Sequence, residues 1–349
     1  MSVRAGALIA AGIPGPELDA ATRERLLALA PSGVVLFARN VRSPEQLRQL
    51  TAALHELPSR PLVAMDQEGG RVARLVAPFT RFPPALRIGA TADAELAWRV
   101  GQALGRELAF AGVDLDFAPV LDVHSNPANT VIGDRAFGDD PGRVTEMALA
   151  QRRGLRAAGV LTCGKHFPGH GDTLADSHFD LPRVERPRAA LERIELPPFR
   201  AAIAAGFEML MMSHVVYAAL DPEWPASMSA AIVRGLLRGE FGYTGVIATD
   251  DMDMRAITRD HDLGDAAVQT LRAGCDWVLA CQSLESAERA AAAIDAAMRA
   301  GDLDALELGA SAARIERLQH WRDEQLRLPL GLPSEEHLAL VGEIERLRT

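Results

Sequence analysis

Residues 160–173 read VLTCGKHFPGHGDT, in which a short apolar run is followed at once by charged and imidazole side chains. Apolar runs of this length, bounded by polar or turn residues, are typical of strands buried in a parallel sheet. Runs of the same kind occur eight times along the chain. They are Gly6–Ala11, Gly33–Phe37, Pro61–Met65, Val113–Val120, Val160–Gly164, Met209–Ser213, Gly245–Thr249 and Trp277–Cys281.

Amphipathic segments rich in alanine and leucine lie between these runs and predict helices. The one that begins at Ser43-Pro44 has a serine suited to capping and a proline suited to the first turn. The predicted helices are Glu45–Leu57, Asp93–Phe110, Gly142–Ala158, Pro187–Ala205, Ser229–Gly239, Gly264–Ala273 and Ser283–Ala300. Eight strands that alternate with helices predict an α/β fold, a (β/α)8 TIM barrel. A doubly wound sheet uses fewer strands and is the second choice.

The chain after Gly301 continues with helical patterns over Leu303–Gln325 and Ser334–Leu347, separated by the proline-containing turn Pro329–Pro333. No internal repeat or low-complexity linker marks a domain boundary. We therefore predict a single TIM-barrel catalytic domain over residues 1–349, with residues 302–349 forming additional helices packed on the barrel.

Composition excludes several classes of protein. The 349 residues are 48% hydrophobic and 24% charged, which excludes an intrinsically disordered chain. A formal net charge of −10 without a basic run argues against a nucleic-acid partner. The cysteines, Cys163, Cys275 and Cys281, lack the spacing of a zinc site and suggest no disulfide framework. No apolar run approaches the roughly 20 residues that cross a bilayer, so we expect no membrane association and a cytoplasmic location. The sequence leaves the oligomeric state open, with a monomer favoured.

Polar residues follow five consecutive runs, at the strand ends where barrel enzymes carry their active sites. These residues are Asp66-Gln67-Glu68, Asp122 with His124 and Arg135, Lys165 to Thr173, Ser213-His214, and Asp250-Asp251. Each has a simpler interpretation. Asp250 and Asp251 could cap a helix, Asp66 could brace the turn at Gly69-Gly70, and Arg135 or Lys165-His166 could serve a loop or reach solvent. Five such strand ends on one face favour a site.

Four other polar residues of these loops are explained equally well by local structure and by contact with a ligand. His170 and Asp172 lie among glycines in a tight loop, and His124 and His214 could be hydrogen-bonded in the interior. Cys163 is better explained by core packing than by nucleophilic catalysis.

Two chemistries could use this cluster. His166, His170, His178, Asp66 and Asp250 could hold a divalent ion for metal-assisted hydrolysis, but neither a His-x-His strand end nor an HExxH helix is present. We therefore expect no metal and no cofactor. Glycosyl transfer needs a carboxylate at a strand end, an acid on a loop and charged groups that bind hydroxyls, and the sequence offers all three.

The stretch KHFPGHGDT at 165–173 also resembles a known family, the single-domain bacterial β-N-acetylglucosaminidases of glycoside hydrolase family three, of the cell-wall recycling type. Further blocks in the family's order extend the resemblance over nearly the whole chain. They are LFARN at 36–40, DQEGGRV at 66–72, FAPVLD at 117–122, GDRAF at 133–137, DSH at 176–178 and TDDM at 249–252. Thr249 and Met252 stand where the family often has serine and leucine.

The resemblance implies a retaining mechanism in which Asp250 is the nucleophile and forms a covalent glycosyl-enzyme. It also implies that His178 is the acid/base and that Asp176 orients it. Many other family members use a glutamate from a second domain, and 349 residues leave no room for one. The matched positions that hold the N-acetylglucosamine ring are Asp66, Arg135, Lys165 and His166, with His214 a weaker candidate.

The implied substrate is a muropeptide or another N-acetylglucosamine glycoside. In the cytoplasm, the enzyme would remove terminal β-linked N-acetylglucosamine from 1,6-anhydro-N-acetylmuramyl peptides. Three alternatives stay open. Phosphate could replace water in the second step, the 2-acetamido group could replace Asp250 as nucleophile, or the barrel could bind sugar without turnover.

Overall fold

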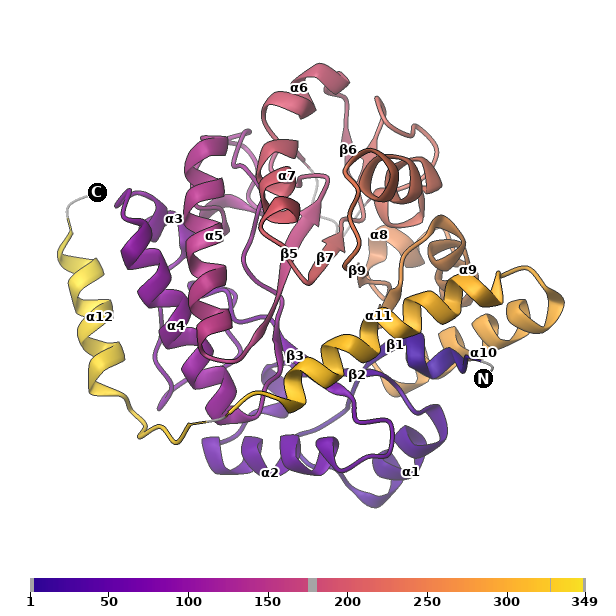
Figure 1. Ribbon diagram of the computed structural model, residues 1–349, viewed down its shortest axis with the longest axis horizontal. Coiled ribbons are helices and arrows are strands. Elements are labelled where there is room, and N and C mark those ends of the chain that lie inside the picture. The colour runs from indigo at the N-terminus through magenta and orange to yellow at the C-terminus, as the bar shows by residue number, and fades with distance from the viewer. Residues whose placement is uncertain (1–2, 175–180, 327, 348–349) are drawn as a thin grey trace.

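The computed structural model describes residues 3–174, 181–326 and 328–347, and over these ranges eight parallel strands close into a barrel (Figure 1). The strand order is β1-β10-β9-β7-β5-β4-β3-β2. The strands are β1 (Ile9–Gly12), β2 (Gly33–Val35), β3 (Leu62–Met65), β4 (Leu115–Asp116), β5 (Leu161–Phe167), β7 (Met209–Met212), β9 (Val246–Asp251) and β10 (Trp277–Ala280). Pairing of Ile9 with Val278 closes the ring, and the predicted TIM barrel is confirmed.

Two of the predicted strands differ from the observed ones. The run Val113–Val120 supplies only the two residues of β4, because Pro119 has no N–H to donate to the ladder. The chain nevertheless stays beside β5, since Leu121 donates its N–H to the Lys165 carbonyl at 2.7 Å. At the N-terminus, Ala5–Leu8 forms a 3-10 helix instead of the start of the first strand. The short parallel pair β6 (Arg183–Val184) and β8 (Val216–Tyr217) lies outside the barrel.

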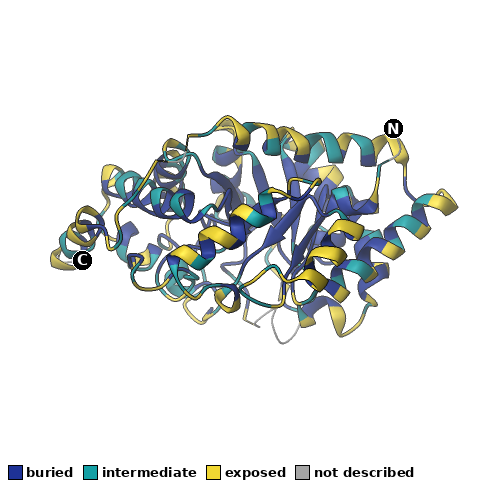
Figure 2. Ribbon diagram, turned by 90° about the horizontal axis from the view of Figure 1, so that it is seen from below, coloured by how far each residue is buried: buried dark blue, intermediate teal, exposed yellow. Residues whose placement is uncertain are grey.

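Helices surround the barrel with their buried faces towards it (Figure 2). The helix α1 (Ala20–Leu29) was not predicted, and the Asp19 carboxylate caps it by accepting the Thr22 N–H at 2.7 Å. The predicted helix Pro187–Ala205 is divided in two, because Pro197 and Pro198 lack the N–H groups that would continue it. The π-helix η5 (Ala231–Glu240) occupies the predicted segment Ser229–Gly239. The α-helices are α1 (Ala20–Leu29), α2 (Pro44–His55), α3 (Ala85–Gly89), α4 (Ala94–Ala111), α5 (Pro141–Ala157), α6 (Arg188–Arg193), α7 (Leu196–Ala204), α8 (Arg255–Thr258), α9 (Leu263–Ala273), α10 (Leu284–Ala300), α11 (Ala305–Asp323) and α12 (Glu335–Arg346).

The C-terminal helices α11 and α12 are present as predicted and are joined to the barrel by buried polar contacts. The ring of His337 on α12 lies 2.7 Å from a carboxylate oxygen of Glu107 on α4. Figure 1 shows α12 beside α4 and α11 crossing near the first strands. Within the described ranges, no helix combines the length and the apolar character needed to cross a membrane.

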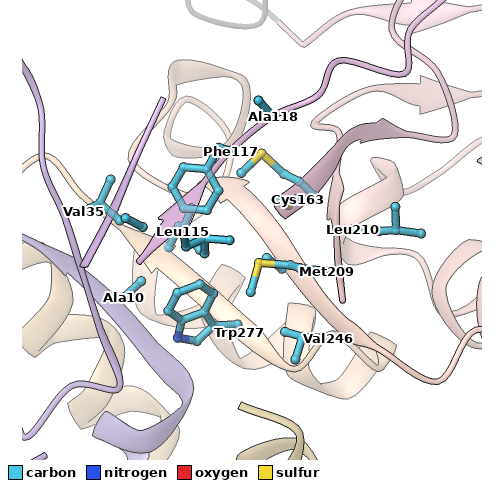
Figure 3. Close-up of a cluster of buried hydrophobic side chains, with 14 of the residues drawn as sticks. Ala10, Val35, Leu115, Phe117, Ala118, Cys163, Met209, Leu210, Val246 and Trp277 are labelled. Atoms are coloured by element: carbon cyan, nitrogen blue, oxygen red, sulfur yellow. The ribbon is translucent and has the colours of Figure 1, made fainter. Parts of the chain in front are cut away.

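Large side chains fill the interior of the barrel, among them Phe117, Met209 and Trp277 (Figure 3). The indole N–H of Trp277 donates to the Ser32 hydroxyl at 2.8 Å, which satisfies its only buried polar atom. A Cβ on Gly33 would lie 2.2 Å from this indole ring, so a glycine is required there. The apolar core therefore fills the interior of the barrel, and the polar residues lie at the carboxyl ends of the strands.

Candidate active site

A cavity of about 270 Å³ opens at the carboxyl ends of the barrel strands, and five of the predicted site residues line it. They are Asp66, Arg135, Lys165, His166 and Asp250. They lie at or after the ends of four different strands, with Lys165 and His166 both on β5, so only closure of the barrel brings these four groups together. His214 does not line the cavity, and Asp176 and His178 lie outside the described residues.

A compact network of charges forms one wall of the cavity. The Lys165 ammonium lies 2.7 Å from an Asp66 carboxylate oxygen and 2.5 Å from one of Glu68. The Arg135 guanidinium forms two 2.8 Å hydrogen bonds with Glu68. The paired geometry of this arginine and carboxylate fixes the direction of both side chains.

The network keeps its members ionised although they are buried. Burial works against the charge of Glu68, but Arg135 and Lys165 outweigh it and hold the pKa of Glu68 far below its usual range. Burial also disfavours the Lys165 cation, yet Asp66 and Glu68 raise the pKa of Lys165. The pKa of Asp66 is lowered against the effect of burial by Lys165 and Arg74. The cavity therefore offers fixed hydrogen-bond donors and acceptors to a polar ligand.

Asp250 lies near the end of β9 and carries an ionised carboxylate. Burial opposes ionisation, but the basic side chains of His166, His214 and Lys165 and the N–H of Asp251 outweigh it, and the pKa of Asp250 falls below its ordinary value. That N–H donates to the Asp250 carboxylate at 2.8 Å. An anion held in this way is suited to attack an electrophilic carbon.

Asp251, the next residue, is in a different environment. One of its carboxylate oxygens accepts the N–H of Cys281 at 3.0 Å and that of Asp253 at 3.2 Å. Burial, followed by the neighbouring Asp253, raises the pKa of Asp251 to about 7. The next helix, α8, has Met254 at its N-cap and no side-chain cap, so neither aspartate caps it, and Asp251 instead organises the turn after β9.

The His166 ring is held in place by the buried carboxylate of Asp122. Its ring Nδ1 lies 2.6 Å from Asp122 Oδ2, and its Nε2 lies 3.5 Å from Arg135 Nη2. The second carboxylate oxygen accepts the N–H groups of His166 and His170 at 3.1 and 2.7 Å. A single buried carboxylate therefore holds both the start and the middle of the loop after β5.

The loop after β5 folds tightly over the barrel. A Cβ on Gly171 would lie 1.6 Å from the Val123 carbonyl oxygen, so the close approach of the two segments requires glycine. His170 lines the cavity and is bonded through Nδ1 to Thr173 at 2.8 Å, and burial lowers the pKa of His170 to about 4. Asp172 pairs with Arg186 at 2.7 Å and so anchors the loop.

His124, His214 and Cys163 are held by local structure. His124 Nε2 lies 3.2 Å from the Asn129 carbonyl oxygen. His214 bonds the Ser227 hydroxyl through Nδ1 and the Asp251 carbonyl through Nε2, and burial lowers the pKa of His214. Burial raises the pKa of the Cys163 thiol well above its usual range, as expected for a core residue.

Three further residues complete the site and were not selected from the sequence. Glu68 bridges Lys165 and Arg135, Asp122 holds His166, and Arg74 lines the cavity with its guanidinium 3.3 Å from Asp66. Glu68 lies in the same block as Asp66, and Asp122 ends the fourth run, so their positions in the sequence were the available signal. Residues 3–174, 181–326 and 328–347 contain no group of three or more His, Cys, Asp or Glu side chains that could hold a metal.

Residues 4–318 match the model of the glycosyl hydrolase family 3 N terminal domain. The chain belongs to this family. A β-hexosaminidase of Nitrosomonas eutropha is 40% identical over 320 residues, which cover 90% of this chain and 88% of the relative. A β-hexosaminidase of Alkalilimnicola ehrlichii is 38% identical over 346 residues, covering 96% and 97%.

Solved structures of the family have the same fold. A β-N-acetylglucosaminidase from a Paenibacillus species superposes with a TM-score of 0.93 at 37% identity, covering 97% of this chain and 67% of the other. NagZ from Neisseria gonorrhoeae, in complex with N-trifluoroacetyl-D-glucosamine, has a TM-score of 0.79 at 32% identity and 98% coverage of both chains. The predicted family and the predicted enzyme class, a β-N-acetylhexosaminidase, are confirmed.

Proposed function

We propose that this family 3 enzyme is a retaining exo-β-N-acetylglucosaminidase in which Asp250 is the nucleophile. The observation that carries the proposal is an ionised, partly exposed Asp250 in the same cavity as Asp66, Arg135, Lys165 and His166. A retaining glycosidase needs an anionic carboxylate below the sugar and polar groups around its hydroxyls. The similarity to the β-hexosaminidases of Nitrosomonas eutropha and Alkalilimnicola ehrlichii supports a hexosamine as the sugar that is released.

The reaction proceeds in two displacements at the anomeric carbon. An Asp250 carboxylate oxygen forms a bond to this carbon while the bond to the leaving oxygen breaks and that oxygen receives a proton. Water then attacks the glycosyl ester, transfers its proton to the base and releases Asp250 as a carboxylate. The family resemblance assigns the proton transfers to His178 and the orientation of His178 to Asp176.

We further propose that the substrate is the N-acetylglucosaminyl anhydro-muropeptide released from peptidoglycan, in the cytoplasm. The family resemblance at 165–173 supports this substrate, and the similarity to NagZ, which was solved with N-trifluoroacetyl-D-glucosamine, supports its N-acetylglucosamine part. A cavity of about 270 Å³ at the mouth of the barrel suits a terminal sugar residue, and so an exo mode of action. The sugar ring would be held by Asp66, Arg135, Lys165 and His166. The leaving group of the substrate would lie towards the opening of the cavity.

The test is to trap the intermediate with a slow fluorosugar and to sequence the labelled peptide by mass spectrometry. A label on the peptide that contains Asp250, absent from Asp250→Asn, would support the covalent route. A label on another carboxylate would contradict it, and catalysis without any adduct would favour participation of the 2-acetamido group.

A second experiment separates the remaining alternatives. We expect the wild type to hydrolyse 4-nitrophenyl N-acetyl-β-D-glucosaminide in phosphate-free buffer, with or without a chelator. A large gain in rate with phosphate would indicate a phosphorylase, loss with the chelator a metal-dependent hydrolase, and no turnover a sugar-binding barrel. Release of N-acetylglucosamine from purified anhydro-muropeptides, compared with chitobiose, tests the substrate.

A further inference from the structure

Asp122 lies beneath the candidate sugar site and does not line the cavity. It is completely buried, and its two carboxylate oxygens have different partners. Oδ1 accepts two backbone N–H groups, from His166 and His170, whereas Oδ2 lies 2.6 Å from Nδ1 of the His166 ring. Burial works against ionisation, but the adjacent imidazole outweighs it and lowers the pKa of Asp122.

This arrangement decides which ring nitrogen of His166 carries a proton. An ionised carboxylate only accepts hydrogen bonds, so Nδ1 must be the donor. On the other side of the ring, Nε2 lies 3.5 Å from Arg135 Nη2, and a guanidinium only donates. Nε2 therefore carries a lone pair, and because Arg135 Nη2 is 3.5 Å away and already donates to Glu68 at 2.8 Å, this lone pair stays available to a closer donor in the cavity.

We propose that Asp122 is a positioning residue that keeps the proton of His166 on Nδ1, so that Nε2 accepts a hydrogen bond from one hydroxyl of the bound sugar. The proposal rests on the proposed function, which assigns His166 to the sugar ring. It adds the direction of the hydrogen bond, and through it a basis for selectivity. A sugar without that hydroxyl leaves Nε2 with only the long 3.5 Å contact to Arg135.

The substitution Asp122→Asn tests this with little change in shape. With the amide oxygen in the place of Oδ1, both backbone N–H bonds are kept. The amide nitrogen then takes the place of Oδ2 and donates to Nδ1, which moves the ring proton to Nε2. Two donors, the new Nε2–H and the Arg135 guanidinium, then face each other, and Nε2 no longer accepts.

The first readout is the tautomer, measured by ¹⁵N NMR on histidine-labelled protein at a pH where the ring is neutral, with His166→Gln to assign the signal. We expect Nδ1–H in the wild type and Nε2–H in Asp122→Asn. This measurement needs no turnover. A wild-type ring with its proton on Nε2 overturns the proposal, even if the variant does not fold.

The second readout is selectivity. We expect kcat/KM on 4-nitrophenyl N-acetyl-β-D-glucosaminide to fall about 10²-fold in Asp122→Asn, the scale for loss of one preorganised hydrogen bond. Against the 3-, 4- and 6-deoxy analogues, one analogue should be a poor substrate for the wild type and should lose almost nothing further in the variant. An equal loss on the parent and on all three analogues indicates a general structural role and overturns the proposal.

Asp114 offers a matched control at the opposite end of β4. Its carboxylate also accepts a backbone N–H, from Val63 at 2.7 Å, and lies 2.8 Å from a histidine ring, that of His55. Asp114→Asn should leave kcat/KM and the His166 tautomer unchanged. If the wild type shows no glycosidase activity while its tautomer is as expected, the proposed function fails and the assignment of the proton on His166 stands.

Discussion

The two ends of the barrel both contain buried ion pairs, but these are built differently. At the amino ends of the strands, Asp276 accepts from Arg238 at 2.5 Å, Arg314 at 3.0 Å, the Ser311 hydroxyl and the N–H of Ile247. Every partner is a protein group that ties a strand to a helix or loop. These charged groups bind one another within the protein, as expected for the end of a TIM barrel whose residues contribute to stability and not to catalysis.

At the carboxyl ends, the charges line a cavity and face it. Lys165 and Arg135 both contact the Glu68 carboxylate. The Asp250 carboxylate accepts a hydrogen bond from the backbone N–H of Asp251. A larger hollow of about 560 Å³ lies at the other end, and its lining mixes alanine and leucine with Gln102, Arg106, Glu324 and Gln325, without the histidines, lysine and aspartates of the candidate site. The kind of side chain, and not the size of the hollow, distinguishes the candidate site. Substitutions at the two ends should therefore affect different measurements.

The largest effect is expected for Asp250→Asn. We expect kcat to fall by at least about 10⁴-fold, the scale of losing a catalytic nucleophile. The free energy of unfolding should decrease slightly, because the lowered pKa of Asp250 means that its charge is favourable in the folded protein, although asparagine can keep the hydrogen bond from Asp251. Nitrophenol release and urea unfolding are the measurements. Turnover comparable to that of the wild type would remove Asp250 from the chemistry.

For Asp276→Ala, at the amino ends of the strands, we expect a loss of stability and no change in kcat. Removing this carboxylate leaves two guanidinium groups without their partner, which should cost about 3–5 kcal/mol in free energy of unfolding. Urea unfolding measures it, and kcat of the folded variant should match the wild type. A fall in kcat without a loss of stability would contradict the division between the two ends.

An intermediate effect is expected from pH, through Asp251. Its pKa of about 7 lies above the ordinary aspartate value of 3.8, so the folded protein binds the proton more tightly than the unfolded chain. The resulting stabilisation is complete below about pH 4 and is lost as the pH rises to about 7. At 1.36 kcal/mol per unit the full shift is about 4 kcal/mol, and we expect about half of it, since the side chain keeps some contact with water.

The matched variant is Asp251→Asn, whose amide oxygen can still accept the two backbone N–H groups. The difference in unfolding free energy between the variant and the wild type should grow in favour of the variant as the pH rises from 4 to 7. Urea unfolding at a series of pH values measures this difference. A difference that does not change over this range would show that Asp251 titrates normally.

The smallest effect is expected for Glu343→Gln on α12. Arg99 contacts this carboxylate at 2.8 Å, but both side chains are more than two-fifths exposed. Exposed pairs of this kind contribute about 0.5 kcal/mol, and salt screens them. Thermal unfolding at low and high salt should show a small difference that disappears at high salt. A loss as large as that of Asp276→Ala would mean that α12 is held mainly by this pair.

Sequence patterns predicted the barrel well because each strand and helix has its own local signal. The eight apolar runs correspond to the eight barrel strands, and the capping pattern at Ser43-Pro44 corresponds to the start of α2, where the serine hydroxyl accepts the Gln46 N–H at 3.2 Å. The errors came from context. The helix α1 has a weak apolar pattern, and paired prolines divide the segment 187–205.

The site was predicted in part. Asp66, Arg135, Lys165, His166 and Asp250 do line one cavity, as the strand-end rule requires. The roles of the partners were not visible, because Glu68 and Asp122 act on residues about 40 to 100 positions away along the chain. No local pattern encodes such a distance. The assignments of His178 and Asp176 remain predictions.

By itself, the sequence determined the alternation of strands and helices and the chemical identity of the groups at the strand ends, since both depend on neighbours in the chain. Tertiary structure decided which charges neutralise one another and which face the cavity. Asp250 and Asp251 are adjacent and chemically identical, yet the pKa of one is lowered and that of the other is raised to about 7. The physical reason is that the pKa of a buried group depends on its desolvation and on charges brought near it by folding, and neither is a property of the local sequence.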